Sequence, residues 1–328
     1  MSLVCTCLTR LFAREMMLLN ELTRFILDNE IAVRLSFFFG VFFVMAAWEF
    51  IAPRRQLVSS KLLRWSNNLA LVFFNSFLLR LLFPTAAIGV AFLVDNRAWG
   101  VLNYFDLPFV VSVILSVIVL DFIIYLQHVM VHAVPALWRL HRVHHADPDF
   151  DITTGVRFHP LEIILSMLIK FSAIILLGPP IVAVIIFEVV LNATSMFNHS
   201  NIRLNTTFDR YLRLFIVTPA MHRVHHSVEP DETNSNFGFS LPWWDRLFGT
   251  YRDQPRAGHQ GMTIGIHQYN RPDQVIWLHK ILLLPFIGKI TEYAINTRYM
   301  KQDNINEDGK NEDGKNIDAM NEADSSSK

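Results

Sequence analysis

The sequence predicts an all-α fold, a polytopic membrane helical bundle with a histidine-rich helical cap on the cytoplasmic side. We expect about four transmembrane helices or hairpin segments. Three observations predict this fold. Hydrophobic residues make up 52% of the 328 residues, and several apolar runs are long enough to cross a bilayer. Ten of the 13 histidines lie between residues 128 and 226. Basic residues without acidic neighbours follow the first apolar run, which is typical of a cytoplasmic loop.

The composition excludes several classes of protein. The formal net charge is +0 and no basic stripe with interleaved aromatic residues is present, so we expect no nucleic-acid partner. The two cysteines, Cys5 and Cys7, are too few for a disulfide framework, an iron–sulfur cluster or a thiolate zinc site. Any bound metal must therefore be held by imidazole groups, with help from carboxylates or amides.

The chain divides into three predicted parts. Residues 1–33 mix apolar and charged side chains and are expected to form an N-terminal interfacial segment. Residues 34–300 form the membrane domain. Residues 301–328 repeat NEDGK and end in SSSK, a composition typical of a disordered polar tail.

The first transmembrane helix is expected at residues 35–53, which are almost wholly apolar. A second apolar run, 68–94, crosses back and is interrupted by Arg80 and Pro84. The loop between the two runs carries four basic and no acidic residues, Arg54, Arg55, Lys61 and Arg64. This loop places the end of the first span in the cytoplasm. The protein is therefore expected to be a multi-pass protein of the inner membrane in a bacterium, or of the endoplasmic reticulum in a eukaryote.

Three further apolar segments follow. The third span, residues 107–131, should return to the cytoplasmic side. Residues 161–197 contain two apolar runs separated by GPP, which predicts a hairpin that enters the membrane and returns. The last apolar run, residues 275–288, is short and carries His279 and Lys280, so an interfacial helix is expected there.

Histidines recur at helical spacing in three places. The pair His128 and His132 forms HxxxH, and the sequence HRVHH occurs twice, ending at His145 and at His226. Residues three and four apart share one face of an α-helix, so each motif places its imidazoles on a single ridge. A lone histidine on a helix is more often a satisfied core residue than a ligand, but scattered core histidines do not cluster in this way.

Polar residues on two predicted spans point along the same faces as histidines. Asp121 lies on the face of His128 and His132, and a carboxylate there is a plausible partner for a ring N–H. On the returning arm of the hairpin, Glu188, Asn192 and Ser195 form a stripe that ends at His199. His159 precedes a proline and has no helical partner. It is as consistent with a role behind a metal site as with a structural contact.

Nine clustered imidazoles are more than one tetrahedral metal site requires. They suggest a pair of ions, each with about four or five nitrogen ligands and an open position. Imidazole binds iron, copper, nickel and zinc, so the ligand type does not name the metal. Neither histidine pair belongs to an HExxH motif, which weakens a zinc-protease interpretation.

The set of motifs resembles the fatty acid hydroxylase / sterol desaturase superfamily. The resemblance covers about residues 35–260 and is carried by HVMVH, HRVHH, NHS, and a second HRVHH followed by NFG and WWDRLFGTY. It implies a membrane-bound oxygenase with two iron ions that uses O2 to hydroxylate or desaturate a C–H bond of a membrane lipid. It also implies that the iron ligands are His128, His132, His141, His144, His145, His199, His222, His225 and His226.

This sequence departs from some members of that superfamily at one position. Those members carry a further histidine four residues before the lone one, where this chain has Ser195. Water or Asn192 would then supply the missing ligand, or the site would have one nitrogen fewer. Asp121, His159, Asn192 and Glu188 are the candidates for residues that support the metal ligands.

Electrons are expected from a separate protein of the ferredoxin or small cytochrome type, because the sequence has no glycine-rich dinucleotide fingerprint and no cytochrome-like segment. Two alternatives use the same histidines. One is a zinc-dependent membrane lipid hydrolase with a metal-bound hydroxide. The other is a metal transporter, which would place ligands through the interior of the spans and not at one face. The lipid, sterol or fatty acyl nature of the substrate is not specified by any residue.

Overall fold

A computed structural model describes residues 17–269, 271–288 and 293–295. Within these residues the regular structure is helical, and extended pairing is limited to two isolated bridges, Pro53 with Ile202 and Ser227 with Ile264. The predicted all-α class is confirmed. Residues 1–16 of the predicted interfacial segment and the whole predicted tail lie outside the described residues.

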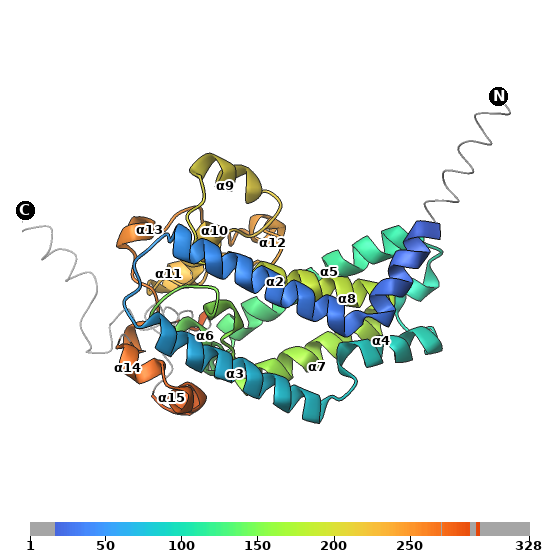
Figure 1. The fold of residues 1–328 in the computed structure, drawn as a ribbon, viewed down its shortest axis with the longest axis horizontal. Helices are drawn as coiled ribbons and strands as arrows, with labels where there is room; N and C mark the ends of the chain where they lie inside the picture. The colour runs from blue at the N-terminus through green and yellow to red at the C-terminus, as the bar shows by residue number, and fades with distance from the viewer. Residues whose placement is uncertain (1–16, 270, 289–292, 296–328) are drawn as a thin grey trace, which may run out of the picture.

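Five helical segments are long and apolar enough to cross a membrane, which makes the chain an integral membrane protein. Figure 1 shows the long helices running side by side along the longest axis of the molecule. The five segments are α2 (Glu30–Ile51), α3 with α4 and η1 (Lys61–Tyr104), α5 (Phe109–Ala133), α7 (Pro160–Leu177) and α8 (Ile181–Asn198).

The second span is broken, as Pro84 predicts. Helix α3 covers Lys61–Leu82, α4 covers Ala86–Arg97, and a short η1 follows at Val101–Tyr104. A proline has no N–H for the helical ladder and its ring crowds the preceding turn, so the helix ends before it. On the far side of the break, α4 packs against α7 and α8 through Ala87, Ala91, Val94, Ile174 and Val184.

The first span begins earlier than expected. Helix α2 starts at Glu30, whereas the apolar run starts at residue 35. Glu30 lies in the first turn, where a carboxylate is favourable beside free backbone N–H groups, and it pairs with Arg34 at 3.7 Å. These two charged residues therefore belong to the helix and do not end it.

The predicted hairpin is present as α7 and α8. Its turn is made by Gly178 with φ +68, followed by Pro179 and Pro180. A Cβ atom at Gly178 would lie 2.3 Å from the carbonyl oxygen of Trp99, so the turn needs glycine both for its backbone angle and for this close approach.

Short helices gather at the end of the bundle where α5 ends and α7 begins, and they form the cap (Figure 1). Helix α6 (Pro135–His145) contains the first HRVHH motif and starts with Pro135, in the position that suits proline best. The other cap elements are α9 (Thr206–Leu212), α10 (Pro219–His225), α11 (Pro230–Thr233), α12 (Trp243–Leu247), α13 (Gly258–Gly261), η2 (Thr154–Val156) and η3 (His267–Tyr269).

The last apolar run differs from the expected single interfacial helix. It is divided into α14 (Pro272–Val275), α15 (Leu278–Leu283) and η4 (Leu284–Phe286). Its buried side chains, among them Ile281 and Leu284, belong to one core cluster with Trp138 and Val143 of α6. The run is apolar because it covers the first histidine helix.

Candidate metal centre

All nine predicted histidines lie together in the cap and none is more than 3% exposed. They form two groups, within each of which one nitrogen atom per ring lies within 4.8 Å of the others. The five-histidine group consists of His128, His132, His141, His145 and His225. The four-histidine group consists of His144, His199, His222 and His226.

Each HRVHH motif contributes to both groups. The first gives His141 and His145 to the five-histidine group and His144 to the four-histidine group. The second gives His225 to the five-histidine group and two histidines to the other. The rings of His145 and His226 stack at a centroid distance of 4.6 Å, so the two groups meet there. The ridge that helical spacing creates is therefore divided between two neighbouring sites.

Several rings are oriented by a hydrogen bond from Nδ1. In the five-histidine group, His128 donates to the Phe237 carbonyl at 2.7 Å, and His225 donates to the Ser235 carbonyl at 2.7 Å. In the four-histidine group, His199 donates to the Ser195 carbonyl at 2.8 Å. A carbonyl oxygen only accepts, so the proton of each neutral ring is on Nδ1 and the lone pair is on Nε2.

The Nε2 atoms of these rings face one another. His128 and His141 are 3.1 Å apart at Nε2, and His199 lies 3.1 Å from His144 and 3.0 Å from His222. His128 and His141 each donate a hydrogen bond from Nδ1 to an acceptor oxygen. Their Nε2 atoms therefore carry lone pairs, and these two lone pairs face each other. Such a contact is unfavourable without a cation, and it fits a site that holds metal ions.

Further ring nitrogens in the two groups have no hydrogen-bond partner among the described residues. They include Nε2 of His132 and His225 and both ring nitrogens of His145 and His226. Buried polar atoms are normally paired, because leaving one unpaired costs about 1–3 kcal/mol. A concentration of unpaired nitrogens in one place therefore indicates that a ligand completes the site.

Six rings outside the spans are held neutral. Burial, followed by the neighbouring imidazoles, lowers the pKa of His144, His145, His222, His225 and His226 well below the usual range. Burial also lowers the pKa of His199 to about 3. Metal binding requires the neutral form of histidine, so these rings offer their lone pairs without first losing a proton.

Two side chains that hold the rings did not stand out in the sequence. Glu162 accepts a hydrogen bond from Nδ1 of His141 at 2.6 Å, and the side-chain oxygen of Asn234 accepts one from Nδ1 of His132 at 3.1 Å. Glu162 lies in the first turn of α7, where a carboxylate looks like an ordinary helix-start residue. Asn234 is 102 residues away from its histidine, beyond the reach of any local spacing rule.

Asp121 is not where the sequence prediction places it. Its carboxylate accepts hydrogen bonds from the Ser240 and Leu241 backbone and from Nε1 of Trp244 at 2.8 Å. None of these hydrogen bonds reaches a histidine ring. The expected ring contact is therefore corrected, since Asp121 leans toward the segment after the NFG motif and fixes that segment to α5.

The other candidates for supporting residues also lie away from the rings. Glu188 binds Lys170 at 2.6 Å and Arg34 at 2.5 Å, eleven residues and about 16 Å along α8 from His199. Asn192 donates to the Glu188 carbonyl at 2.7 Å. His159 caps α7 by accepting from the Leu161 N–H, and it faces the Leu282 carbonyl. Its contacts are therefore structural.

A cavity of about 420 Å³ extends from the histidines into the bundle. His128 and His141 line one end, and the cluster of Arg34, Lys170 and Glu188 also lines it. Every one of the five spans contributes to the wall, with Phe38, Val72, Ile124, Met167 and Leu191 among the apolar side chains. The cavity therefore joins the candidate metal centre to the membrane-spanning part of the protein.

The segment from Asn234 to Phe239, of which Phe239 lines this cavity, is fixed by an aspartate. Asp245 accepts hydrogen bonds from the Phe237 and Gly238 N–H groups, each at 2.8 Å. Asn236 has a left-handed φ of 51, which asparagine tolerates better than most residues, and its side chain binds the Met221 carbonyl at 2.9 Å. The NFG and WWD motifs thus position the carbonyl that orients His128.

Comparison with known proteins points to one family. Residues 113–250 match the family model described as fatty acid hydroxylase. The ornithine lipid hydroxylase OlsE of Rhizobium tropici is 30% identical over 187 residues, which are 55% of this chain and 56% of that protein. Human alkylglycerol monooxygenase is 30% identical over 149 residues, 45% of this chain and 32% of that protein.

A fungal relative, the fatty acid hydroxylase vlmA of a Lecanicillium species, is 29% identical over 171 residues, 47% of each chain. No solved structure gives a significant match. The chain spans between about a third and about half of the length of these curated relatives. All nine clustered histidines lie within residues 113–250, the region that is similar to the fatty acid hydroxylase family.

Proposed function

We propose that this protein is a membrane-bound di-iron oxygenase that uses O2 to hydroxylate a C–H bond of a membrane lipid. One observation carries the proposal. Two groups of buried imidazoles lie together, and His128 and His141 of the five-histidine group line a cavity of about 420 Å³ to which all five spans contribute. The names of the relatives, which include an ornithine lipid hydroxylase and alkylglycerol monooxygenases, support lipid hydroxylation in preference to hydrolysis.

In this proposal each histidine group holds one iron ion. Five nitrogens would serve the first ion and four would serve the second, which is the number that the sequence prediction requires. Iron at this position would supply the activation of O2 and the removal of hydrogen from an unactivated C–H bond, for which no side chain can substitute. The reaction would consume O2, two electrons and two protons, and it would produce the hydroxylated lipid and one water molecule.

The chain's own groups would orient the ligands and the substrate. Glu162, Asn234 and the Phe237 carbonyl fix the rings of His141, His132 and His128, each through Nδ1. Partners of this kind increase the basicity of a ligand and are worth about 10–100-fold in metal affinity. The apolar wall would accept a hydrocarbon chain from the bilayer and keep bulk water from the reacting carbon.

The remaining parts of the proposal concern the surroundings of the site. The basic loop after α2 supports a cytoplasmic position of the cap. A separate ferredoxin or small cytochrome would deliver the two electrons at that face. Sterol, fatty acyl and other membrane lipids all contain a hydrocarbon part that fits the cavity's chemistry. The names of the relatives favour lipids built on an amino acid or on an alkylglycerol.

The test combines metal analysis with lipid analysis. Purified full-length protein should contain about two irons per chain, and cells that express it should accumulate a lipid heavier by one oxygen atom, only in the presence of O2. His199→Ala should abolish both results. His279→Ala is the matched control, because His279 is exposed and belongs to neither histidine group.

Turnover of lipid under strict anaerobiosis would instead indicate a hydrolase. Zinc as the sole metal, without oxygen consumption after iron loading, would also contradict the proposal. A product lighter by two hydrogen atoms would identify desaturation as the reaction.

A further inference from the structure

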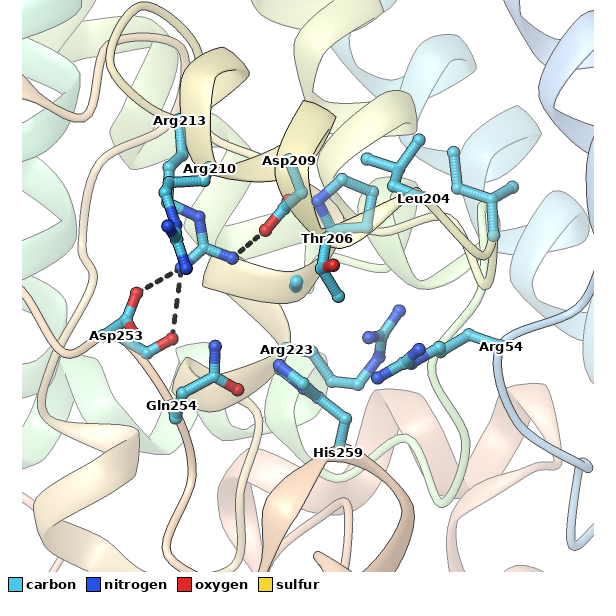
Figure 2. A pocket seen from close by; sticks show the side chains of 13 residues that line it. Arg54, Leu204, Thr206, Asp209, Arg210, Arg213, Arg223, Asp253, Gln254 and His259 are labelled. Carbon is cyan, nitrogen blue, oxygen red and sulfur yellow. Dashed lines mark hydrogen bonds and ion pairs between the residues drawn. The ribbon is translucent and has the colours of Figure 1, made fainter.

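A second pocket lies in the cap, outside the metal centre. Its volume is about 260 Å³, and it is lined by four arginines together with His259. Arg54 comes from the loop after α2, Arg210 and Arg213 from the region of α9, and Arg223 from α10. Figure 2 shows Arg54, Arg223 and His259 gathered on one side of the pocket, with Arg213 and its aspartates across from them.

Both carboxylates that line this pocket form ion pairs with one arginine, Arg213. Asp209 and Asp253 both bind Arg213, the latter at 2.6 Å from Nη1 to Oδ1. Arg54, Arg210 and Arg223 make no ion pair among the described residues. Four guanidinium groups and two carboxylates leave a formal excess of two positive charges around the pocket.

Arg223 is the most unusual member of the set. Arg223 is 1% exposed, yet among the described residues it donates one hydrogen bond, to the Ser200 carbonyl at 3.4 Å, and its Nε has no hydrogen-bond partner. Its guanidinium lies over the ring of Phe150 at 5.1 Å from the centroid, a contact that supplies no negative charge. A buried charge is costly unless it is paired and hydrogen-bonded, so this guanidinium lacks the partner that its position requires.

Arg64 and Arg157, which are also fully buried, are bonded more completely. Arg64 binds Asp147 at 2.7 Å and Asp151 at 2.8 Å. Arg157 donates to the carbonyls of Val143 and Val275 at 2.8 Å and 2.7 Å. The weak bonding of Arg223 is therefore specific to this pocket and not a general property of buried arginines in this fold.

His259 adds a neutral donor beside the arginines. It is 7% exposed and neither ring nitrogen has a partner among the described residues. Burial, then the neighbouring arginines with Arg223 first, lower the pKa of His259 to about 3. A neutral imidazole has one N–H to donate, and the pocket thus presents unpaired N–H groups from two buried side chains.

We propose that this pocket binds an oxyanion of the phosphate class, supplied either by the headgroup of an anionic lipid or by free phosphate. Arginine forks match the oxygens of phosphate in pairs, and such charge-assisted bonds are among the strongest in proteins. A bound phosphate would give Arg54 and Arg223 the negative partner that they lack and would accept the N–H of His259.

The surface beside the pocket favours the lipid headgroup as the source. Helix α9 exposes Phe208 and Tyr211, and Phe215 follows it, with exposed fractions of 56%, 65% and 65%. Exposed aromatic side chains at such density are typical of contact with the membrane interface. Basic pockets at that level bind lipid headgroups. The site is separate from the histidine groups, so it goes beyond the proposed oxygenase function.

The experiment measures both sources with the full-length protein in neutral detergent. Equilibrium dialysis with radiolabelled inorganic phosphate, at constant ionic strength, gives the affinity for the free ion. Native mass spectrometry with phosphatidic acid, and with phosphatidylcholine as the reference lipid, gives the affinity for the headgroup. The variants are Arg54→Gln and Arg210→Gln, both of which remove a lining charge without a metal ligand nearby in the chain.

Arg203→Gln is the matched control. Arg203 is exposed and lies between the lining residues Ile202 and Leu204 in the chain, but it does not line the pocket. We expect saturable binding of phosphate, of phosphatidic acid or of both, weakened about tenfold or more in the two pocket variants and unchanged in the control. Unchanged melting temperature and metal content would show that the variants fold.

Binding of phosphatidic acid without binding of inorganic phosphate would identify the headgroup as the source, and binding of both would add free phosphate. Either result supports the pocket. Absence of saturable binding in both arms, equal retention of phosphatidylcholine, or an equal loss in Arg203→Gln would overturn the proposal, because the attraction would then be absent or unspecific.

Discussion

The two HRVHH motifs have the same sequence, and both contribute histidines to the two groups, but their surroundings differ. In both, the three histidines lie within one helical ridge and are divided between the two groups. The arginine differs. Arg142 donates through Nη2 to the carbonyls of Leu284 and Ile287, at the end of the cap's last apolar run. Arg223 faces a pocket of other arginines.

This difference separates what local sequence determines from what it does not. The spacing of the histidines fixes their position on a helix, so both motifs deliver rings to the same centre. The arginine of each motif bonds outside that centre, and its hydrogen-bond partners come from parts of the chain that are distant in sequence. Arg142 donates to two backbone carbonyls, whereas Arg223 donates one long hydrogen bond to the Ser200 carbonyl.

The largest effect should come from removing the rings where the motifs meet. His145→Ala and His226→Ala remove two stacked rings, one from each group. Each variant should lose most of its bound metal and more than about 100-fold in activity, since even the partners behind metal ligands are worth about 10–100-fold. Metal per chain and product formation are the measurements. Full metal content in either variant would contradict the assignment of that ring as a ligand.

The next effect should distinguish the motifs. Glu162 supports His141 of the first motif, while Nδ1 of His222 in the second has no hydrogen-bond partner in the described chain. Glu162→Gln keeps an acceptor oxygen but loses the charge, and metal affinity should fall about tenfold. Competition with a chelator measures it. Ser166→Ala, at a position of the same cavity that does not contact a ring, should leave the affinity unchanged.

The two arginines should differ in their contribution to stability. Arg142→Gln removes charge-assisted bonds to two backbone carbonyls, those of Leu284 and Ile287, and should destabilise the protein by about 2 kcal/mol. Arg223→Gln removes one long bond and relieves repulsion from Arg54 and Arg55, so its cost should be below about 1 kcal/mol. Thermal unfolding of metal-loaded protein in detergent compares them. A larger loss of stability for Arg223→Gln than for Arg142→Gln would mean that the protein itself already supplies Arg223 with strong partners.

The smallest effect on metal binding is expected for Asp121→Asn. Its three bonds hold the segment from Ser240 to Trp244, so the variant should lose about 1 kcal/mol of stability and keep its metal affinity. A tenfold loss of metal affinity would restore the original prediction that Asp121 supports the histidines directly.

Helical spacing was sufficient to predict most of the architecture. The apolar runs predict the spans, Pro84 predicts the break in the second, and the histidine motifs predict a cluster of nine rings. These features are local, because a run or a ridge is defined by residues a few positions apart. The interfacial helix at 275–288 was less accurate, since its apolar side chains cover α6 and do not form one regular element.

Long-range contacts are what the sequence did not reveal. The prediction for Asp121 assumed that a polar residue on the face of His128 serves it, whereas the carboxylate turns toward a segment 119 residues away. Asn234 and the Phe237 carbonyl hold rings of α5 across comparable separations. The boundaries of the three predicted parts, 1–33, 34–300 and 301–328, stay predictions.

The downstream position of these supports has a consequence for biosynthesis. His128 and His132 leave the ribosome about a hundred residues before the Phe237 carbonyl and Asn234 that orient them. Arg139 is separated by 146 and 149 residues from Pro285 and Gly288, whose carbonyls accept its hydrogen bonds. Contacts of such separation form late. The rings of His128 and His132 on α5 are therefore made before the groups that orient them. A chain that ends before residue 234 would carry all nine histidines but would lack Asn234 and the Phe237 carbonyl.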